Sequence, residues 1–337
     1  MNLDFTGRTV LVVGGAGYVG SVLVTRLLDA GAQVRILDQL VYDNGFAVAH
    51  LLDDDRLSLT RGDLRDRRVF ARAAEGATDV VLLASLVGDP VCKKYPELAQ
   101  EVNVDGAKSI IDSLDELGVE RFVFTSTCSN YGIHDPSSLA AEDSVLNPQS
   151  LYARTKIDVE QYLLERAKRM DCSATVLRIA TAYGLSPRMR FDLTVSQFAW
   201  ELSSGASLLV YDADTWRPYC HIRDISKAVM TALTSQPHRV RAEVFNVGDN
   251  TQQFTKRMIV EEVQKHLGGT QVEYRAGDTD PRNYRVSFDK IVDQLGFRCE
   301  HSVQTYLPAL TAAVQAGVFP DVQTNPKFGN YEVKNLA

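Results

Sequence analysis

Tyr152 and Lys156, in the segment Tyr-Ala-Arg-Thr-Lys, are a pair of residues that can move a proton. On a helix, residues four apart lie on one face, so the lysine ammonium can approach the phenol. A tyrosine normally loses its proton near pH ~10, and a nearby positive charge lowers that pKa. Such a phenol can take a proton from an alcohol or give one to a ketone. Because Tyr and Lys four apart also form ordinary surface pairs, a catalytic interpretation requires further motifs.

A glycine-rich loop near the start of the chain predicts a dinucleotide-binding site. An apolar, strand-like run at 9–13 precedes the loop at 14–20, a helix-like segment follows at 21–30, and a second strand at 33–37 ends in Asp38. Glycines allow a tight turn against the pyrophosphate, and the helix N-terminus holds its negative charge. A carboxylate at Asp38 would bond the adenosine ribose and repel a 2′-phosphate, which favours NAD over NADP. The alternative is a glycine turn in an unrelated α/β protein.

Composition and charge exclude several classes of protein. The 337 residues carry a net charge of −7 without a basic block, which argues against a nucleic-acid partner. No apolar run reaches the ~18 residues of a membrane-spanning helix, so no membrane partner is expected. The five cysteines are scattered and show no metal-ligand spacing, so we expect no metal site. Such cysteines are typical of reduced thiols in a cytoplasmic protein.

Strand-like and helix-like segments alternate through the first half of the chain. This alternation predicts an α/β fold, with a Rossmann-type, doubly wound parallel sheet. After residue 181 the alternation breaks, which predicts a smaller, discontinuous C-terminal substrate-binding lobe. We expect the Rossmann domain over 1–180 and about 222–248, and the lobe over about 181–221 and 249–337. The expected strands are 9–13, 33–37, 56–61, 79–84, 121–126, 174–178 and 243–248, and the expected helices include 66–74, 96–117, 152–170, 194–203 and two that begin after Thr255 and Ser287.

Taken together, these motifs resemble the extended short-chain dehydrogenases/reductases, specifically the NAD-dependent nucleotide-sugar epimerase/dehydratase family. The match runs from Val10 to about Asp289 and includes glycines spaced three apart, a Gly-Asp-Leu segment at 62–64 and a Ser/Thr-rich strand end at 124–132. The resemblance implies NAD as cofactor. It implies cofactor contacts from Gly14, Gly17, Tyr18, Val19, Gly20, Asp38, Asp63, Leu64, Ala84, Ser85, Tyr152 and Lys156.

The resemblance also assigns catalytic roles. Tyr152 is the base that removes a sugar hydroxyl proton while hydride passes to the nicotinamide. Lys156 lowers the pKa of Tyr152, and the positive nicotinamide ring acts in the same direction. The hydroxyl residue four before the Tyr-Gly pair is Thr127, which positions the reacting hydroxyl.

The two positions after Thr127 narrow the chemistry. The 4,6-dehydratases of the family usually carry Asp-Glu there, and the glucuronate decarboxylases usually place a glutamate nearby. This chain has Cys128 and Ser129. A thiol with a lowered pKa could act as an acid or base, but we interpret Cys128 as a small residue packed behind the site. We therefore expect a 4-epimerase that works through a transient 4-keto sugar. The alternatives are a nucleotide-sugar 4-ketoreductase or dehydrogenase, then a 4,6-dehydratase or a non-catalytic cofactor-sensing protein.

The resemblance places a nucleotide-diphosphate sugar in the second lobe. Arg217 begins an Arg-x-x-x-His-x-x-Asp element and would bind the diphosphate, because guanidinium matches phosphate geometry. His221 and Asp224 would fix the geometry of the lobe. The remaining expected substrate contacts are Val87, Thr127, Arg282 and Arg285. Arg188 and Arg190 could meet the hexose or form a solvated basic loop, and the helices at about 97–117 and 152–170 would form a homodimer.

Overall fold

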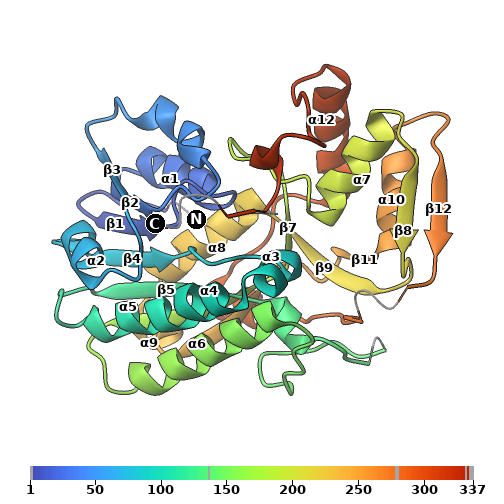
Figure 1. Ribbon diagram of the computed structural model, residues 1–337. Helices are drawn as coiled ribbons and strands as arrows, with labels where there is room; N and C mark the ends of the chain where they lie inside the picture. Colours follow the sequence, from blue (N-terminus) through green and yellow to red (C-terminus); the bar gives the residue numbers. More distant parts are fainter. Residues whose placement is uncertain (1–2, 136, 278–280, 331, 334–337) are drawn as a thin grey trace.

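The chain folds around a seven-stranded parallel sheet, in a computed structural model that describes residues 3–135, 137–277, 281–330 and 332–333 (Figure 1). Its strands are apolar and β-branched because helices cover both faces of such a sheet. In chain order, the strands of this sheet are β1 (Thr9–Val13), β2 (Gln33–Asp38), β3 (Leu57–Arg61), β4 (Asp79–Leu82), β5 (Arg121–Thr127), β6 (Ser173–Ile179) and β10 (Glu243–Val247).

The strand order confirms the predicted doubly wound topology. The order is β10-β6-β5-β4-β1-β2-β3, and every neighbouring pair is parallel. The chain therefore starts at β1, builds outward through β2 and β3, and then returns to β4 on the other side. Open α/β sheets bind ligands at the carboxyl ends of the strands where the order reverses. Here that place lies between β1 and β4.

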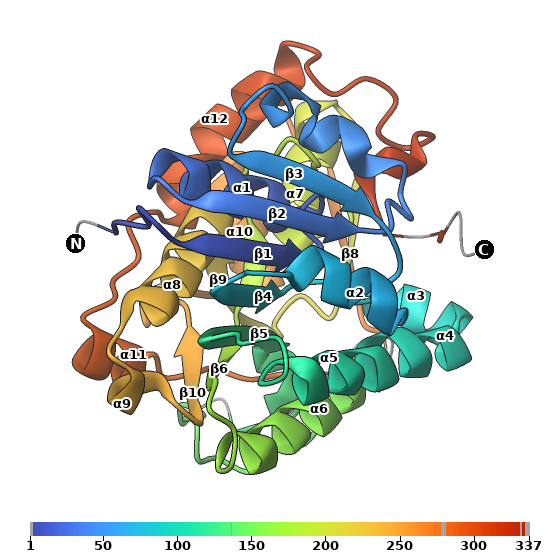
Figure 2. The same ribbon diagram turned by 90° about the vertical axis from the view of Figure 1, so that its left-hand side faces the viewer.

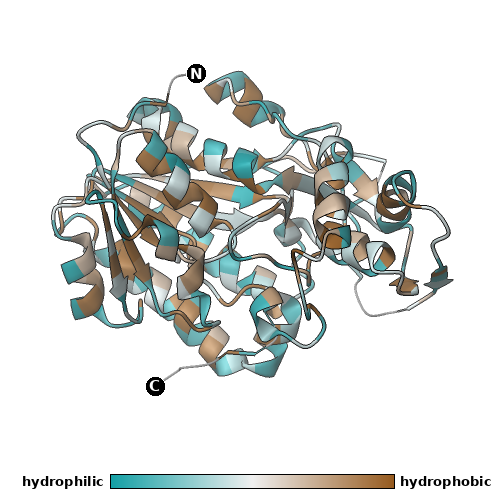
Figure 3. Cartoon of the chain, turned by 90° about the horizontal axis from the view of Figure 1, so that it is seen from above, coloured by the Kyte–Doolittle hydropathy of each residue, from teal (hydrophilic) through white to brown (hydrophobic). Residues whose placement is uncertain are grey.

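Two hydrophobic cores lie on the two faces of the sheet. Helices α1 (Gly20–Asp29) and α8 (Ile222–Thr234) pack on one face. Helices α2 (Arg67–Ala74), α5 (Ala107–Ser113) and α6 (Leu151–Ala167) cover the other, as Figure 2 shows. Alternate residues of β1 contribute to the two cores in turn. Figure 3 shows apolar residues concentrated along the strands and on the helix faces turned towards them.

The connection from β4 to α5 contains an irregular turn. The connection consists of α3 (Asp89–Lys94), α4 (Pro96–Gln100) and the π-helical segment η3 (Glu101–Gly106), and η3 is the irregular turn. The sequence predicts one helix over 96–117, but the helical segments end at Ser113 and one turn is π-helical. Turns of this kind occur frequently at functional sites, and this one carries Asn103.

The second lobe is assembled from separate pieces of the chain, as Figure 1 shows. It contains two small sheets and a group of packed helices. The boundaries expected from the sequence, about 181–221 and 249–337, remain a prediction. One sheet comprises β7 (Thr181–Tyr183), β9 (Trp216–His221) and β11 (Gln253–Thr255), the other comprises β8 (Leu208–Tyr211) and β12 (Val272–Arg275), and the packed helices are α7 (Thr194–Ser203), α10 (Lys256–Gln264) and α12 (Val303–Gln315). The other short elements are α9 (Pro237–Val240), α11 (Asp289–Leu295), η1 (Asn44–Ala47), η2 (Ala49–Leu51), η4 (Cys128–Tyr131) and η5 (Pro326–Phe328).

The predicted helix starts in this half of the chain have different outcomes. The side chain of Thr255 accepts a hydrogen bond from the Met258 amide and caps α10, as predicted. The helix predicted after Ser287 is α11, but its N-cap position is Phe288, which makes no side-chain cap. The Ser287 hydroxyl instead donates to the Asp289 carboxylate at 2.8 Å. None of the helices in the described ranges is long and apolar enough to cross a membrane.

Candidate active site

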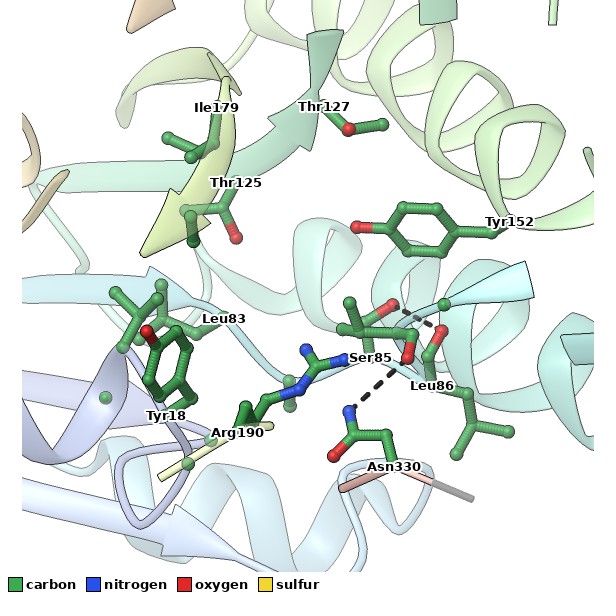
Figure 4. A pocket seen from close by; sticks show the side chains of 18 of the residues that line it. Tyr18, Leu83, Ser85, Leu86, Thr125, Thr127, Tyr152, Ile179, Arg190 and Asn330 are labelled. Carbon is green, nitrogen blue, oxygen red and sulfur yellow. Dashed lines mark hydrogen bonds between the residues drawn. The ribbon is translucent and has the colours of Figure 1, made fainter. Parts of the chain in front are cut away.

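A cavity of about 670 Å³ opens at the carboxyl ends of the central strands. Its wall combines the loop after β1, the ends of β2, β4 and β5, the start of α6 and segments of the second lobe (Figure 4). The fold therefore brings together motifs that lie far apart in the sequence. The predicted residues that line it are Gly14, Gly17, Tyr18, Val19, Gly20, Asp38, Asp63, Leu64, Ala84, Ser85, Val87, Thr127, Tyr152, Lys156, Arg217 and Arg282.

Two glycines of the loop, Gly14 and Gly20, leave no room for a side chain. Gly14 has φ +89°, and a Cβ there would lie 2.7 Å from the backbone nitrogen of Ala84. A Cβ on Gly20 would lie 2.2 Å from the carbonyl oxygen of Gly14. Because α1 begins at Gly20, its N-terminus and positive dipole end lie at the cavity wall. This arrangement fits a bound pyrophosphate.

Asp38 closes the same end of the cavity. Its carboxylate accepts hydrogen bonds from the backbone amides of Ala16, at 3.0 Å, and Leu40, at 2.9 Å. Burial raises the pKa of Asp38, while these hydrogen bonds act in the opposite direction. The carboxylate is thus fixed beside the glycine loop, at the end of β2, where it can accept hydrogen bonds from ribose hydroxyls.

An ion pair, Arg65–Asp63, and a buried amide, Asn103, fix the part of the wall next to Asp38. The Arg65 guanidinium donates to Asp63 and, against the effect of burial, lowers the pKa of that carboxyl group. Asn103, in the π-helical turn, bonds both backbone groups of Leu86: its Oδ1 accepts from the amide at 2.7 Å and its Nδ2 donates to the carbonyl at 3.1 Å. These contacts fix the segment after β4 where it borders the cavity.

Tyr152, Lys156 and Thr127 meet at the centre of the cavity. Helix α6 begins just before Tyr152, because the Ser150 side chain caps it by accepting a hydrogen bond from the Ala153 amide. The Tyr152 hydroxyl points into the cavity, and Thr127 lies at the end of β5 facing the same space (Figure 4). The Lys156 ammonium donates to the Thr125 carbonyl at 2.9 Å. Thr127 Oγ1 accepts from the Ser129 amide at 3.1 Å, which leaves its hydroxyl proton to be directed to a ligand.

The protonation of this group depends mainly on burial. Burial raises the pKa of Tyr152, and among nearby charges Arg190 and Arg282 lower it. Burial also lowers the pKa of Lys156 to about 7. Burial therefore dominates the pKa of Tyr152, contrary to the simple expectation from the spacing of Tyr152 and Lys156. The positive charge of an oxidised nicotinamide would add to the effect of Arg190 and Arg282 and favour the phenolate.

Cys128 lies behind the site. Its thiol is 1% exposed, donates to the Arg178 carbonyl at 3.2 Å and does not line the cavity. Burial raises the pKa of this thiol, so it stays protonated. The placement agrees with the interpretation of Cys128 as a packing residue.

The substrate lobe contributes a group of arginines and aromatic rings. Arg217 lies over the Tyr284 ring, 5.3 Å from its centre, and donates to the Arg282 carbonyl. The Arg282 side chain forms an ion pair with Asp89 at 3.1 Å and reaches the Ser129 hydroxyl. Asp89 and Tyr284 also line the cavity, although the sequence motifs did not predict either of them. The carboxylate just after Val87 and Gly88 was a local signal for Asp89, whereas nothing local indicated Tyr284.

Arg285 is not among the described residues that line the cavity, and its contact with substrate stays a prediction. Its guanidinium lies on the Trp216 ring, 5.0 Å from the ring centre. Its backbone carbonyl accepts from the Ala140 amide, which fixes the strand-like segment on which it lies. Alternate residues of an extended segment point to opposite sides, and Tyr284 takes the side that faces the cavity.

Arg188 and Arg190 are buried, at 2% and 7% exposure, so they do not form a solvated loop. Arg188 packs over Tyr42, 4.8 Å from the ring centre. Arg190 is close enough to Tyr18 to lower the pKa of that phenol, although burial raises it overall. Both arginines line the cavity at the end that holds the glycine loop.

His221 and Asp224 hold the second lobe together, as expected. His221 caps α8 and stacks on His301, with ring centres 4.3 Å apart. Asp224 accepts from the backbone amides of Glu300 and His301. Burial lowers the pKa of His221 to about 3, so it is neutral near pH 7. Neither residue lines the cavity.

The fold and the site together define a class of enzyme that uses a dinucleotide cofactor and a Tyr/Lys pair for acid–base chemistry. The chain belongs to the NAD dependent epimerase/dehydratase family, whose sequence model matches residues 10–248. The family, the enzymatic nature of the protein and NAD as its cofactor are thereby confirmed as predicted.

Individual relatives agree with this assignment. The chain is 31% identical, over 87% of its length and 91% of the relative, to the UDP-glucose 4-epimerase of Corynebacterium glutamicum. A solved structure of UDP-glucose 4-epimerase from Thermus thermophilus in complex with NAD matches with a TM-score of 0.79 and 26% identity, over 91% of this chain and 99% of that one. MoeE5 in complex with UDP-glucose and NAD matches with a TM-score of 0.81 and 25% identity, over 92% and 100% of the two chains.

Proposed function

We propose that this protein is a nucleotide-sugar 4-epimerase that acts through a transient 4-keto sugar. The observation that carries the proposal is the arrangement around Thr127. A hydroxyl and the Tyr152 phenol face the cavity, while the next position is a thiol turned away from it. The relatives named UDP-glucose 4-epimerase and the UDP-glucose complex of MoeE5 support a nucleotide-diphosphate sugar as the substrate.

The proposed roles follow from the positions of the side chains. Bound NAD supplies the hydride acceptor. Tyr152 takes the proton from the sugar 4-hydroxyl and returns it after the ketone has turned its other face. Thr127 bonds the same oxygen and holds it in line, and Lys156 contributes positive charge beside Tyr152. Arg217 and Arg282 would hold the diphosphate, which leaves the hexose free to rotate.

The carboxylates of the cavity argue against an elimination step. Among the described lining residues, the carboxylates are Asp38, Asp63, Asp89 and Asp192. Asp89 influences Tyr152 electrostatically but is ion-paired with Arg282. Asp38 lies beside the glycine loop and accepts from the Ala16 amide. Asp63 and Asp192 form ion pairs with Arg65 and Arg190. A 4,6-dehydratase needs an acid and a base at the sugar beyond the Tyr152 phenol, and Ser129 supplies neither.

Purified enzyme tests the proposal directly. UDP-, dTDP-, GDP- and CDP-hexoses are each incubated with the protein without added cofactor, and the products are separated by chromatography and identified by proton NMR. The expected result is interconversion of one pair of 4-epimers to equilibrium. A stoichiometric requirement for NADH or NADPH would instead show a net reductase, and release of a 4-keto-6-deoxy product would show a dehydratase.

The assembly and the location of the protein are part of the same proposal. Helices α5 and α6 lie side by side on one face of the sheet (Figure 2) and would pair with the same helices of a second copy, giving a homodimer. We place the enzyme in the cytoplasm, where its cysteines would stay reduced. Light scattering during gel filtration should give twice the chain mass of 37.3 kDa, and a mass of one chain would contradict the dimer.

A further inference from the structure

The wall of the cavity that faces the glycine loop carries a buried charged group that the family motifs do not explain. Arg190 lines the cavity, and its guanidinium points into it (Figure 4). Its Nε and Nη2 atoms bond the two carboxylate oxygens of Asp192, at 2.9 and 2.5 Å. Within the described part of the chain, its Nη1 atom has no hydrogen-bond partner. The side chain is therefore fixed in direction by Asp192 while one donor edge remains for a ligand.

The same wall holds a second buried cation, Arg188, which lies near Asp38 and Asp192 without forming an ion pair with either. Arg188 is 2% exposed and forms no ion pair with any described residue. Its guanidinium donates to the Gly329 carbonyl at 3.0 Å and lies over Tyr42. Burial lowers its pKa to about 10, and the neighbouring Arg190 adds to this effect. Buried cations are costly unless they are paired, so this wall would be stabilised by an anionic ligand.

The segment 326–330 connects this wall to the opposite side of the cavity through hydrogen bonds. The Phe191 amide donates to the Phe328 carbonyl at 2.7 Å, and the Asn330 amide donates to Asp192 at 3.3 Å. The Asn330 side chain donates to the Val87 carbonyl, also at 3.3 Å. Val87 follows β4, so one residue bridges the second lobe and the Rossmann sheet. Asn330 and Val87 both line the cavity.

We propose that Arg190 binds the diphosphate of the dinucleotide, and that residues 326–330 are a strap that retains the cofactor. In this proposal, Arg190 lies on the side of the diphosphate opposite α1. The diphosphate is then held between the N-terminus of α1 and the Arg190 guanidinium. Asp192 and Asn330 are positioning residues that fix Arg190 and close the strap. The inference concerns cofactor binding and does not depend on which sugar reacts.

The test compares the wild type with Arg190→Met, Arg190→Lys and Asn330→Ala. An exposed arginine just after α6 gives the matched control, Arg169→Met, because its side chain is 82% exposed. NAD per protomer is measured after acid release, and the affinities of cofactor-stripped protein for NAD, ADP-ribose, adenosine and UDP are measured by calorimetry. Thermal unfolding of the stripped proteins verifies that each variant is folded.

For Arg190→Met we expect about 10- to 100-fold weaker binding of NAD and ADP-ribose, the loss typical of a charge-assisted hydrogen bond, with adenosine binding unchanged. Arg190→Lys should recover part of the loss. Asn330→Ala should release NAD faster, and Arg169→Met should match the wild type. Weaker UDP binding with normal NAD content would overturn the proposal, because Arg190 would then hold the substrate. Equal loss of adenosine and NAD would also overturn it, because Arg190 would then only support the fold.

Discussion

Burial raises the pKa of the Tyr152 phenol, Asp89 acts in the same direction, and Arg190 and Arg282 oppose them. Burial favours the neutral phenol, and it also favours the neutral amine of Lys156. A reaction that oxidises an alcohol needs the phenolate, so positive charge must be supplied when the cofactor is bound. An oxidised nicotinamide would supply that charge. Cofactor binding would therefore favour release of the Tyr152 proton.

Replacing Tyr152 with phenylalanine removes the proton-transfer group and keeps the ring. We expect kcat to fall by about 10²- to 10⁴-fold, the usual contribution of general acid–base catalysis. The content of bound NAD should stay normal. Tyr162→Phe on the same helix is the matched control, because its hydroxyl bonds Asp112 outside the cavity. Full activity of Tyr152→Phe would exclude Tyr152 as the acid–base residue.

Lys156 predicts a specific dependence of stability on pH. Its folded-state pKa of about 7 lies below the ordinary value of 10.5, so between these values the unfolded chain binds a proton that the folded chain does not. Stability contributed by this group therefore rises with pH through that window, by up to about 1.4 kcal/mol per pH unit. Below pH ~7 both states are protonated, and the folded state carries the full cost of burying the charge.

Urea unfolding of cofactor-stripped Lys156→Met and wild-type protein, at several pH values from 6 to 10, checks this sign. The methionine variant should exceed the wild type in free energy of unfolding most at pH 6, and the difference should shrink as the pH rises. A difference that stays constant, or grows with pH, would show that Lys156 remains charged in the folded protein.

At the scale of elements, the loop between β1 and α1 shows why a short motif could be recognised. Its requirements are local: Gly14 needs a positive φ, and Gly20 packs against the carbonyl of Gly14. Residues that contact each other and lie only a few positions apart in the chain produce a pattern that can be recognised in the sequence. The facing wall depends on the contact of Asp192 with Asn330, which are 138 residues apart. Residues so distant in the chain form no local pattern.

Gly20→Ala should damage this loop more than its small size suggests. The added Cβ would lie 2.2 Å from the Gly14 carbonyl oxygen and 2.8 Å from the Gly15 Cα. The backbone must shift, so we expect a loss of at least about 1–3 kcal/mol in free energy of unfolding, typical of overpacking, together with loss of bound NAD. Gly268→Ala is the control, since a Cβ added there would have no neighbouring atom within 4 Å. Equal stability and NAD content of the two variants would refute the packing argument.

At the scale of the whole molecule, the sequence was most informative for the sheet and its cofactor end. The strands were predicted because apolar β-branched runs alternate with helices, and the order of motifs then placed Thr127 and Tyr152 in one site. The second lobe was predicted less well. Its strands are short, β9 contains Pro218, and helix α8 follows β9 without a loop between them. Their partners are far away in the chain, so local pattern carries little information about them.

One buried polar network connects the parts of the molecule behind the site. Arg178 in β6 is 4% exposed and donates to the carboxylate of Glu160 in α6, which is 2% exposed. It also donates to the Tyr131 hydroxyl at 2.9 Å, and that hydroxyl donates to Asn246 in β10 at 2.8 Å. Tyr131 follows the catalytic end of β5. The network therefore fixes α6, which carries Tyr152, against β5, which carries Thr127.

Glu160→Leu leaves the Arg178 guanidinium buried without its carboxylate. We expect this variant to lose about 3–5 kcal/mol in free energy of unfolding, whereas the double variant Glu160→Leu/Arg178→Met should recover most of it, because paired buried charges also cost desolvation. Glu165→Leu, on the same helix, breaks an exposed ion pair with Lys168 and should cost no more than about 1 kcal/mol. Denaturant unfolding with NAD present measures all three. If Glu160→Leu were no more costly than Glu165→Leu, the network would not be what joins α6 to the sheet.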